Sequence, residues 1–156
     1  MSSRYFEVLP HTADKRIKAY GESLAELFKN AALGMFSLMA RLEDYTASEA
    51  REFGIEAIDL ESLLRDWLAE LLYMFEVDRI LFVDFEIHSL EGCIDNHSTL
   101  DAVSRPVACR LKATARGLPF DYGIEWQGSA VKAVTRHDLY IKETEKGFEA
   151  QIIFDV

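Results

Sequence analysis

The chain has 156 residues, of which 49% are hydrophobic and 28% charged, and its formal net charge is −10. This size and composition predict one domain over residues 1–156, with a core large enough to fold without stabilising disulfide bonds or metal ions. The negative charge argues against strong direct binding of nucleic acid, because affinity for a phosphate backbone comes mainly from lysine and arginine. A basic protein partner or a bound cation fits this charge better.

Neither cysteine fits a metal or redox motif. Cys93 and Cys109 lack CxxC spacing, so no zinc knuckle or redox pair is indicated and both thiols are expected to be reduced. No signal peptide opens the sequence, and no apolar run is long enough to cross a bilayer. The sequence therefore predicts a cytoplasmic protein without membrane association.

The first third of the chain predicts two strands and a helix. Residues 5–9 favour a strand that stops at Pro10, and residues 15–20 alternate between apolar and charged side chains, which is typical of a half-buried strand. Ser23 and Glu26 form a capping-box pattern, so a helix should begin there. Its apolar residues recur at helical spacing as far as Met39 and predict a core face.

The middle of the chain predicts a strand, a second helix and a longer strand. Residues 52–58 alternate, and Asp59 is a plausible N-cap for a helix whose wide leucine stripe should be fully buried. The carboxylates on its other side are then expected to form a solvated face (Asp66, Glu70 and Glu76). Residues 80–90 favour a strand, and the polar residues 91–104 favour a loop or insertion.

The last third of the chain is rich in predicted strands. They cover residues 105–116, 131–135, 139–142 and 148–156, with a connection at 117–128 and a hairpin turn at 145–147. Strands outnumber the two helices and are not regularly interleaved with them. The predicted class is therefore α+β, with a mixed or antiparallel sheet packed with two main helices.

Polar groups with metal-binding chemistry occur at both ends of the chain. His11 and Asp14 lie in the run His-Thr-Ala-Asp between the first two strands, and the last strand ends in Asp155 followed by the α-carboxylate of Val156. If the two ends meet, Asp14, Asp155 and Val156 could surround a hard cation such as Ca²⁺ or Mg²⁺. A nearby His11 would also allow Mn²⁺ or Zn²⁺. Taken singly, Asp14 could equally be a turn residue or a strand-start cap. His11 could equally be hydrogen-bonded to nearby backbone, and Asp155 could belong to a frayed strand end.

Two further residues have both a structural and a functional interpretation. Lys132 is a lone cation in an apolar strand, which is more often a solvent-facing lysine than a group aimed at a carboxylate or phosphate. His137 and Asp138 are adjacent and would point to opposite faces of an extended strand, so they do not form a dyad by themselves. No P-loop, G-x-G-x-x-G, G-x-S-x-G or H-E-x-x-H motif is present, and a self-sufficient enzyme is not indicated.

Several segments, in order along the chain, resemble the archease family. They are His11-Thr12-Ala13-Asp14, Ala19-Tyr20-Gly21, the Leu-x-x-Leu-Phe-x-Asn-Ala-Ala helix, residues 59–73, Val131-Lys132-Ala133-Val134-Thr135 with His137, and Phe154-Asp155-Val156. The resemblance implies an α+β fold and a non-catalytic accessory protein of the RtcB-type tRNA-splicing RNA ligase. That ligase uses GTP to join a 2′,3′-cyclic phosphate or 3′-phosphate end to a 5′-hydroxyl, in tRNA splicing and RNA repair.

The resemblance also implies roles for particular residues. The family's metal site falls on Asp14, Asp155 and the carboxylate of Val156, with Ca²⁺ as the expected cation, and its functionally important lysine falls on Lys132. Partner activation is expected to involve His11 and His137 as well. GTP and tRNA would be engaged through the ligase, whose guanylylated intermediate the family promotes.

The chain departs from the family pattern at Lys15 and Arg16, where an apolar residue and a glycine are commoner. These two cations could weaken metal affinity or contact the partner or nucleotide. Two other functions remain open on the sequence. One is a chaperone-like interaction module, and the other is a small metal-dependent hydrolase that uses His11 and Asp14.

Overall fold

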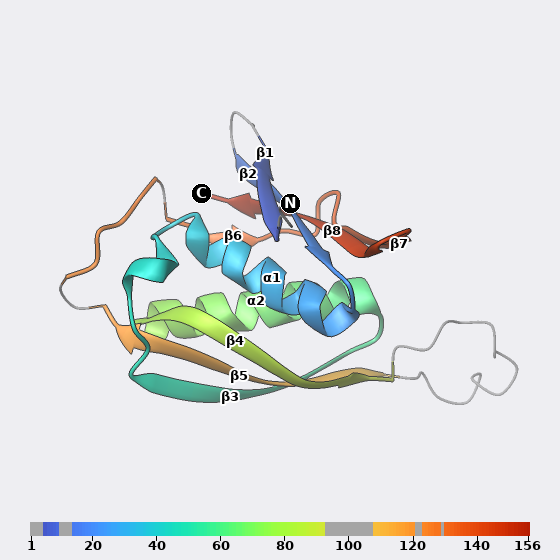
Figure 1. The fold of residues 1–156 in the computed structure, drawn as a ribbon, viewed down its shortest axis with the longest axis horizontal. Coiled ribbons are helices and arrows are strands. Elements are labelled where there is room, and N and C mark those ends of the chain that lie inside the picture. The colour runs from blue at the N-terminus through green and yellow to red at the C-terminus, as the bar shows by residue number, and fades with distance from the viewer. Residues whose placement is uncertain (1–4, 10–13, 93–107, 121–122, 129) are drawn as a thin grey trace, which may run out of the picture.

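Two helices lie between two antiparallel sheets (Figure 1). The structure is a computed structural model that describes residues 5–9, 14–92, 108–120, 123–128 and 130–156. The helices are α1 (Leu24–Ser37) and α2 (Leu60–Val77). The first sheet has the order β1–β2–β8–β6, with β7 also paired to β8, and the second has the order β3–β5–β4. The predicted α+β class with two main helices is confirmed, and the strands divide into a five-stranded and a three-stranded sheet.

The strands of the first sheet are β1 (Phe6–Leu9), β2 (Asp14–Gly21), β6 (Ala133–Val134), β7 (Tyr140–Thr144) and β8 (Gly147–Asp155). Those of the second are β3 (Glu49–Ala57), β4 (Ile80–Glu91) and β5 (Cys109–Pro119), and a short 3₁₀ helix spans Leu42–Asp44. The predicted hairpin turn at residues 145–147 joins β7 to β8. The strand predicted over residues 131–135 is shorter, because only Ala133 and Val134 form ladder pairs with β8.

Side-chain caps fix the starts of both helices. The Ser23 hydroxyl accepts a hydrogen bond from the Glu26 N–H at 3.1 Å, and the Glu26 carboxylate accepts one from the Glu22 N–H. The Asp59 carboxylate accepts a hydrogen bond from the Ser62 N–H at 2.7 Å. Both caps satisfy amide groups that the first turn of a helix leaves without partners, and both confirm the predicted helix starts.

The core lies between the layers and is rich in aromatic rings. Phe36 of α1 contacts Phe82 and Phe85 of β4, and Trp67 of α2 contacts Phe53 of β3 edge-on at 5.5 Å between centroids. The Trp67 indole N–H is buried and donates to the Phe28 carbonyl oxygen at 3.1 Å, which links the two helices. The predicted apolar stripes of both helices therefore face the core, as expected.

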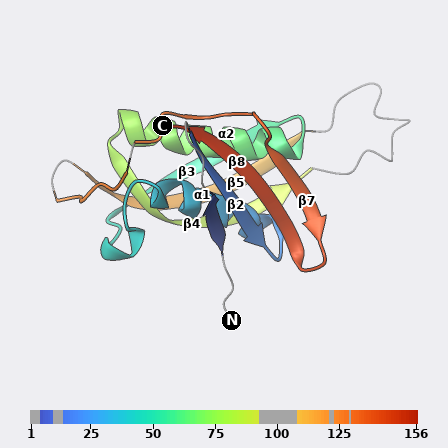
Figure 2. The same cartoon turned by 90° about the horizontal axis from the view of Figure 1, so that it is seen from above.

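The strand β8 lies inside the first sheet and brings the C-terminal end of the chain beside the N-terminal strand β2. It pairs with β2 over eight residues, from Gly21 opposite Phe148 to Asp14 opposite Asp155. Its alternate residues Ala150, Ile152 and Phe154 are fully buried and face the helices. Figure 2, seen from above, shows β2, β8 and β7 side by side, with the C-terminus at one end of this sheet.

Two expectations fare differently at the end of the second sheet. Most of the predicted loop at 91–104 lies outside the described residues, as does Cys93. Cys109, the first residue of β5, is disulfide-bonded, so the prediction of reduced cysteines is wrong for it. Sequence spacing could not reveal this, because it is the pairing of Glu91 with Arg110 that brings β4 and β5 together there.

Within the described residues, neither helix combines the length and apolarity needed to cross a membrane.

Candidate functional site

Two carboxylate side chains meet at the end of the first sheet where the chain terminates. Asp14 is the first residue of β2 and Asp155 the last of β8, and the register places them directly opposite one another. Directly opposed residues on antiparallel strands point to the same face of the sheet, with Cβ atoms roughly 4.5–5.5 Å apart. Asp14 is half-buried and Asp155 is exposed. Like charges in this relation repel each other, so a cation between them would be stabilising.

Lys132 and Val156 lie at the same end of the sheet. The Lys132 N–H donates to the Asp155 carbonyl oxygen at 2.8 Å, and Ala133 pairs with Asp155. Continuing this register by one residue sets Lys132 opposite Val156. The Lys132 side chain is exposed and makes no ion pair or hydrogen bond with any described residue. We name the group of Asp14, Lys132, Asp155 and Val156 the carboxylate tip.

The two predicted histidines are not part of this group in the described structure. His11 lies outside the described residues, as do Thr12 and Ala13. His137 lies in the turn between β6 and β7, beyond Thr135, whose N–H already bonds to Ile153 rather than to the end of β8. Its Nε2 lies 3.6 Å from the Asp138 carboxylate, and both side chains are largely exposed. The left-handed backbone at Asp138 turns the chain, so the pair is in contact although the two residues are adjacent.

Arg16 shares the face of the two carboxylates and was noticed in the sequence only as a departure from a family pattern. It follows Asp14 by two residues on β2 and lies opposite Ile153. Its Nε atom is buried and has no hydrogen-bond partner among the described residues. Lys15 is opposite the fully buried Phe154 and therefore on the other face. The strand period of two predicts this difference, because only every second residue of β2 lies on the face of Asp14 and Asp155.

Farther along the same face, Glu149 of β8 gathers two lysines and a tyrosine. Its carboxylate accepts a hydrogen bond from the Tyr140 hydroxyl at 2.6 Å and lies 3.8 Å from Lys18 and 3.7 Å from Lys142. Burial, followed by the hydrogen bond to Glu149 and its charge, raises the pKa of Tyr140 to about 12. The tyrosine therefore remains a neutral donor near pH 7. Sequence reasoning missed this cluster, although alternation along β8 could have placed Glu149 on the outer face.

The chemistry of the tip suits a hard divalent cation, but its protein ligands are few. Carboxylate oxygens are the donors that Ca²⁺ and Mg²⁺ prefer. Among the described residues, no group of three or more His, Cys, Asp or Glu side chains could hold a metal ion. Asp14 and Asp155 supply two carboxylates, and the half-buried Val156 lies beside them. The donor set fits a cation with coordination positions left for water, a nucleotide or a partner.

Comparison with known proteins gives full-length matches. Residues 6–156 match the model of the "Archease protein family (MTH1598/TM1083)". A protein named "Protein archease" from Methanosarcina barkeri is 38% identical over 154 residues, covering 98% of this chain and 97% of its own length. "Protein archease" from Pyrococcus abyssi is 33% identical and covers 97% of this chain and 98% of its own length.

Two solved structures share the fold. The solution structure of protein 1598 of Methanobacterium thermoautotrophicum is 34% identical, with a TM-score of 0.75, and covers 97% of this chain and 99% of its own. The crystal structure of a Thermotoga maritima protein, described as an archease and possible chaperone, is 18% identical, with a TM-score of 0.56, and covers 100% of this chain and 99% of its own. This second likeness concerns the fold alone.

Proposed function

This chain belongs to the archease family, and from that membership we propose that it is a non-catalytic activator of an RtcB-type RNA ligase. It would promote guanylylation of the ligase by GTP and allow multiple turnover in tRNA ligation and RNA repair. The observation that supports this proposal is the opposition of Asp14 and Asp155 beside Lys132, whose side chain pairs with no described residue. Such a tip can carry a cation and a free ammonium group to the phosphates of a nucleotide held by another protein.

Each residue of the carboxylate tip has a proposed task. Asp14 and Asp155, with the carboxylate of Val156, would supply oxygen ligands to a divalent cation, Ca²⁺ by family resemblance or Mg²⁺, Mn²⁺ or Zn²⁺. The cation supplies positive charge that compensates the negative charge of a polyphosphate. Lys132 would orient a phosphate or a ligase carboxylate, because it projects at the tip without a partner among the described residues. Phosphoryl transfer depends mainly on such positioning and charge compensation.

The net charge of −10 supports an encounter with a basic, RNA-binding surface. In this proposal the chain meets the ligase and not the RNA, and both GTP and tRNA remain bound to the ligase. Association of the two proteins should then slow as salt is added, because screening shortens the reach of the field. An association rate that is insensitive to ionic strength would contradict electrostatic steering without affecting the role of the tip.

The test is guanylylation of the RtcB-type ligase from the same source, with GTP and Mn²⁺, in the presence and absence of this protein. We expect acceleration by the wild-type chain and its loss in Asp14→Ala, Asp155→Ala and Lys132→Ala. Glu143→Gln is a matched control, because Glu143 is also an exposed acid of this sheet, on β7, but lies outside the tip. No acceleration by the wild type, or equal loss in Glu143→Gln, would overturn the proposal.

The two alternative functions have separate tests. A chaperone-like module is suggested by the Thermotoga protein, which is described as a possible chaperone and shares only the fold with this chain. Such a module would suppress aggregation of unrelated proteins whether or not Asp14 is changed. A metal-dependent hydrolase that uses His11 and Asp14 would turn over phosphoesters without the ligase, and His11→Ala would abolish that turnover.

A further inference from the structure

The strand β3 is an open edge of the second sheet. It pairs with β5 on one side, and no described strand pairs with its other side. Its pairing with β5 is regular over nine residues, from Glu49 to Ala57, without a register shift. At about 3.3 Å per residue, this leaves an edge about 30 Å long on which backbone N–H and C=O groups face outward. Such an edge is a ready template for another strand.

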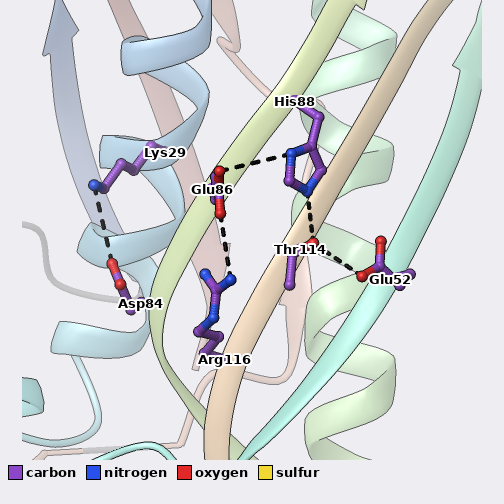
Figure 3. A network of polar contacts seen from close by, with 7 residues as sticks. All are labelled: Lys29, Glu52, Asp84, Glu86, His88, Thr114 and Arg116. Carbon is purple, nitrogen blue, oxygen red and sulfur yellow. Dashed lines mark hydrogen bonds and ion pairs between the residues drawn. The ribbon is translucent and has the colours of Figure 1, made fainter.

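The opposite edge of the same sheet, β4, is protected in ways that β3 is not. Its register with β5 shifts twice, between Phe82 and Asp84 and between Ile87 and Ser89. Bulges of this kind twist an edge away from further pairing. In addition, Lys29 of α1 reaches Asp84 of β4 at 3.9 Å (Figure 3). Of the two edges of the second sheet, β3 is therefore the one that is both exposed and regular.

A groove of about 630 Å³ runs between β3 and α2. Its apolar floor is formed by half-buried side chains, among them Ile55 of β3 and Ala69 and Met74 of α2. Tyr73 stands at its side and is 59% exposed. In the middle of the strand, a Cβ atom placed on Gly54 would meet nothing within 4 Å. An added strand would therefore find backbone partners on one side and a place for its side chains on the other.

Acidic residues border the groove, and none of the described residues that line it is basic. Asp66 and Glu70 of α2 lie on the groove side of the sheet. Glu52 and Glu56 of β3 lie opposite Thr114 and Arg110, and their carboxylates are on the outer face of the sheet, away from α2. Glu56 pairs with Arg110 at 2.7 Å, and Asp66 pairs with Arg65 at 2.9 Å. Glu70 makes no ion pair with any described residue. Part of the acidic charge is thus compensated within the chain, and part remains for a ligand.

Glu52 is held in place by a chain of polar contacts across the sheet. The Thr114 hydroxyl donates to the Glu52 carboxylate at 3.2 Å and lies 2.7 Å from the His88 Nε2 atom (Figure 3). Because the single hydroxyl hydrogen goes to Glu52, His88 must donate to Thr114 through Nε2. The Thr114 hydroxyl is uncharged, so within the described part of the chain the negative charge of Glu52 remains uncompensated on the outer face of β3.

We propose that the groove between β3 and α2 binds an extended, basic segment of a partner protein, which adds to β3 as a fourth strand. Recognition by strand addition takes affinity from main-chain hydrogen bonds and selectivity from the side-chain environment. Side chains of the added strand alternate between the two faces of the sheet. One set lies beside Glu52 and Glu56 on the outer face, where lysine or arginine is favoured. The other set lies over the apolar floor beside α2, with Glu70 at its margin. This proposal goes beyond the carboxylate tip and does not depend on the identity of the ligase.

A second copy of this chain is a poorer occupant. Two β3 edges in contact would bring Glu52 and Glu56 of each copy against those of the other, and like charges across a strand pair are destabilising. Charge on an edge also discourages aggregation generally. In β3 this charge is combined with a regular ladder and a groove that has an apolar floor. Protection against aggregation requires only the charge, so the ladder and the groove favour a binding role.

The test uses three fluorescein-labelled ten-residue peptides. The first alternates lysine with valine and threonine, the second has glutamate in place of lysine, and the third is the basic peptide with alternate backbone amides methylated. We expect saturable binding of the first by fluorescence anisotropy and at least tenfold weaker binding of the other two. Amide chemical-shift changes in the full chain should be confined to β3 and to the side of α2 that carries Ala69 and Tyr73.

Variants separate the groove from general charge. Ala69→Trp fills the floor without adding charge and should weaken binding of the basic peptide at least tenfold, while circular dichroism confirms that the helix persists. Glu52→Gln with Glu70→Gln should also weaken binding, whereas Glu43→Gln with Glu125→Gln removes the same charge elsewhere and should not. Absence of saturable binding, equal loss in both double variants, or shift changes away from β3 would overturn the proposal. Concentration-dependent changes in β3 without peptide would do so too, by identifying a second copy as the occupant.

Discussion

Asp14 and Asp155 lie directly opposite one another on neighbouring strands, although nearly the whole chain separates them in sequence. In the absence of a cation their charges repel, so Asp155→Asn should raise the free energy of unfolding in chelator by about 0.2–1 kcal/mol. Added Ca²⁺ should raise the melting temperature of the wild type but not of the variant, because ligand binding to the folded state is stabilising. Thermal unfolding with chelator and with Ca²⁺ measures both effects. A variant that is less stable than the wild type in chelator would contradict this account.

Lys132 should matter for activation and not for stability. Its side chain has no partner among the described residues, so Lys132→Ala should change the free energy of unfolding by less than about 0.5 kcal/mol. Guanylylation of the ligase should nevertheless fall at least tenfold. Lys132→Arg retains the positive charge and should restore part of the rate. Paired urea unfolding and guanylylation assays check this, and a variant that loses stability and activity together would point to a structural lysine.

Arg16 should weaken cation binding at the carboxylate tip. It lies on the same face as Asp14 and two residues away, and its positive charge opposes that of a cation. Arg16→Gln should therefore raise Ca²⁺ affinity about twofold to fivefold, a small effect that solvent screening keeps modest. Lys15→Gln removes the same charge from the opposite face and should change affinity less. Calorimetric titration measures the Ca²⁺ affinity of both variants. Equal changes in affinity would show that the face of β2 on which the charge lies does not matter.

Tyr140 should ionise later than an ordinary tyrosine. Its pKa in the folded chain is raised from 10.0 to about 12, mainly by burial and by the hydrogen bond to Glu149. The unfolded chain releases this proton first, so the stability that Tyr140 contributes is fully present below pH 10 and is lost as the pH rises through about 12. The difference in ultraviolet absorbance between wild type and Tyr140→Phe should show this late titration. A difference curve with its midpoint near pH 10 would contradict it.

Asp59 should stabilise the chain through its cap on α2. Removal of the carboxylate in Asp59→Ala leaves the Ser62 N–H without its 2.7 Å partner and should cost about 0.5–2 kcal/mol of unfolding free energy. Asp59→Asn keeps an acceptor oxygen at the same position and should cost little. Urea unfolding of the two variants measures the difference. Equal losses would show that the negative charge near the helix start, and not the hydrogen bond, is what stabilises α2.

The helices could be predicted from the sequence because their signals are local. Ser23 and Asp59 are caps that act within one turn, and the apolar stripes follow the helical period. The division of the strands into two sheets could not be predicted, because it depends on pairings such as Glu49 with Gly117 between distant segments. Local alternation likewise overestimated β6, where only Ala133 and Val134 pair in the ladder.

The candidate site divides in the same way. The chemistry of Asp14 and Asp155 suggested their association, and the register of β2 with β8 places them together, while their role stays a prediction. The groove beside β3 has no sequence signature, because Ile55 and Ala69 belong to elements whose packing alone makes them neighbours. From the sequence, the acids of α2 were expected only to form a solvated face.

The pairing of β2 with β8 also bears on how the tip comes into existence during folding. Contacts between distant parts of a chain form late and slowly, because a large loop must close first. Neither strand alone carries two opposed carboxylates, so the tip exists only once this long-range pairing is complete. Cation binding would then link β2 to β8 in the completed sheet and slow the separation of the two strands. The carboxylate tip would therefore form only in the fully folded chain, and a partly folded chain would present no such site to a partner.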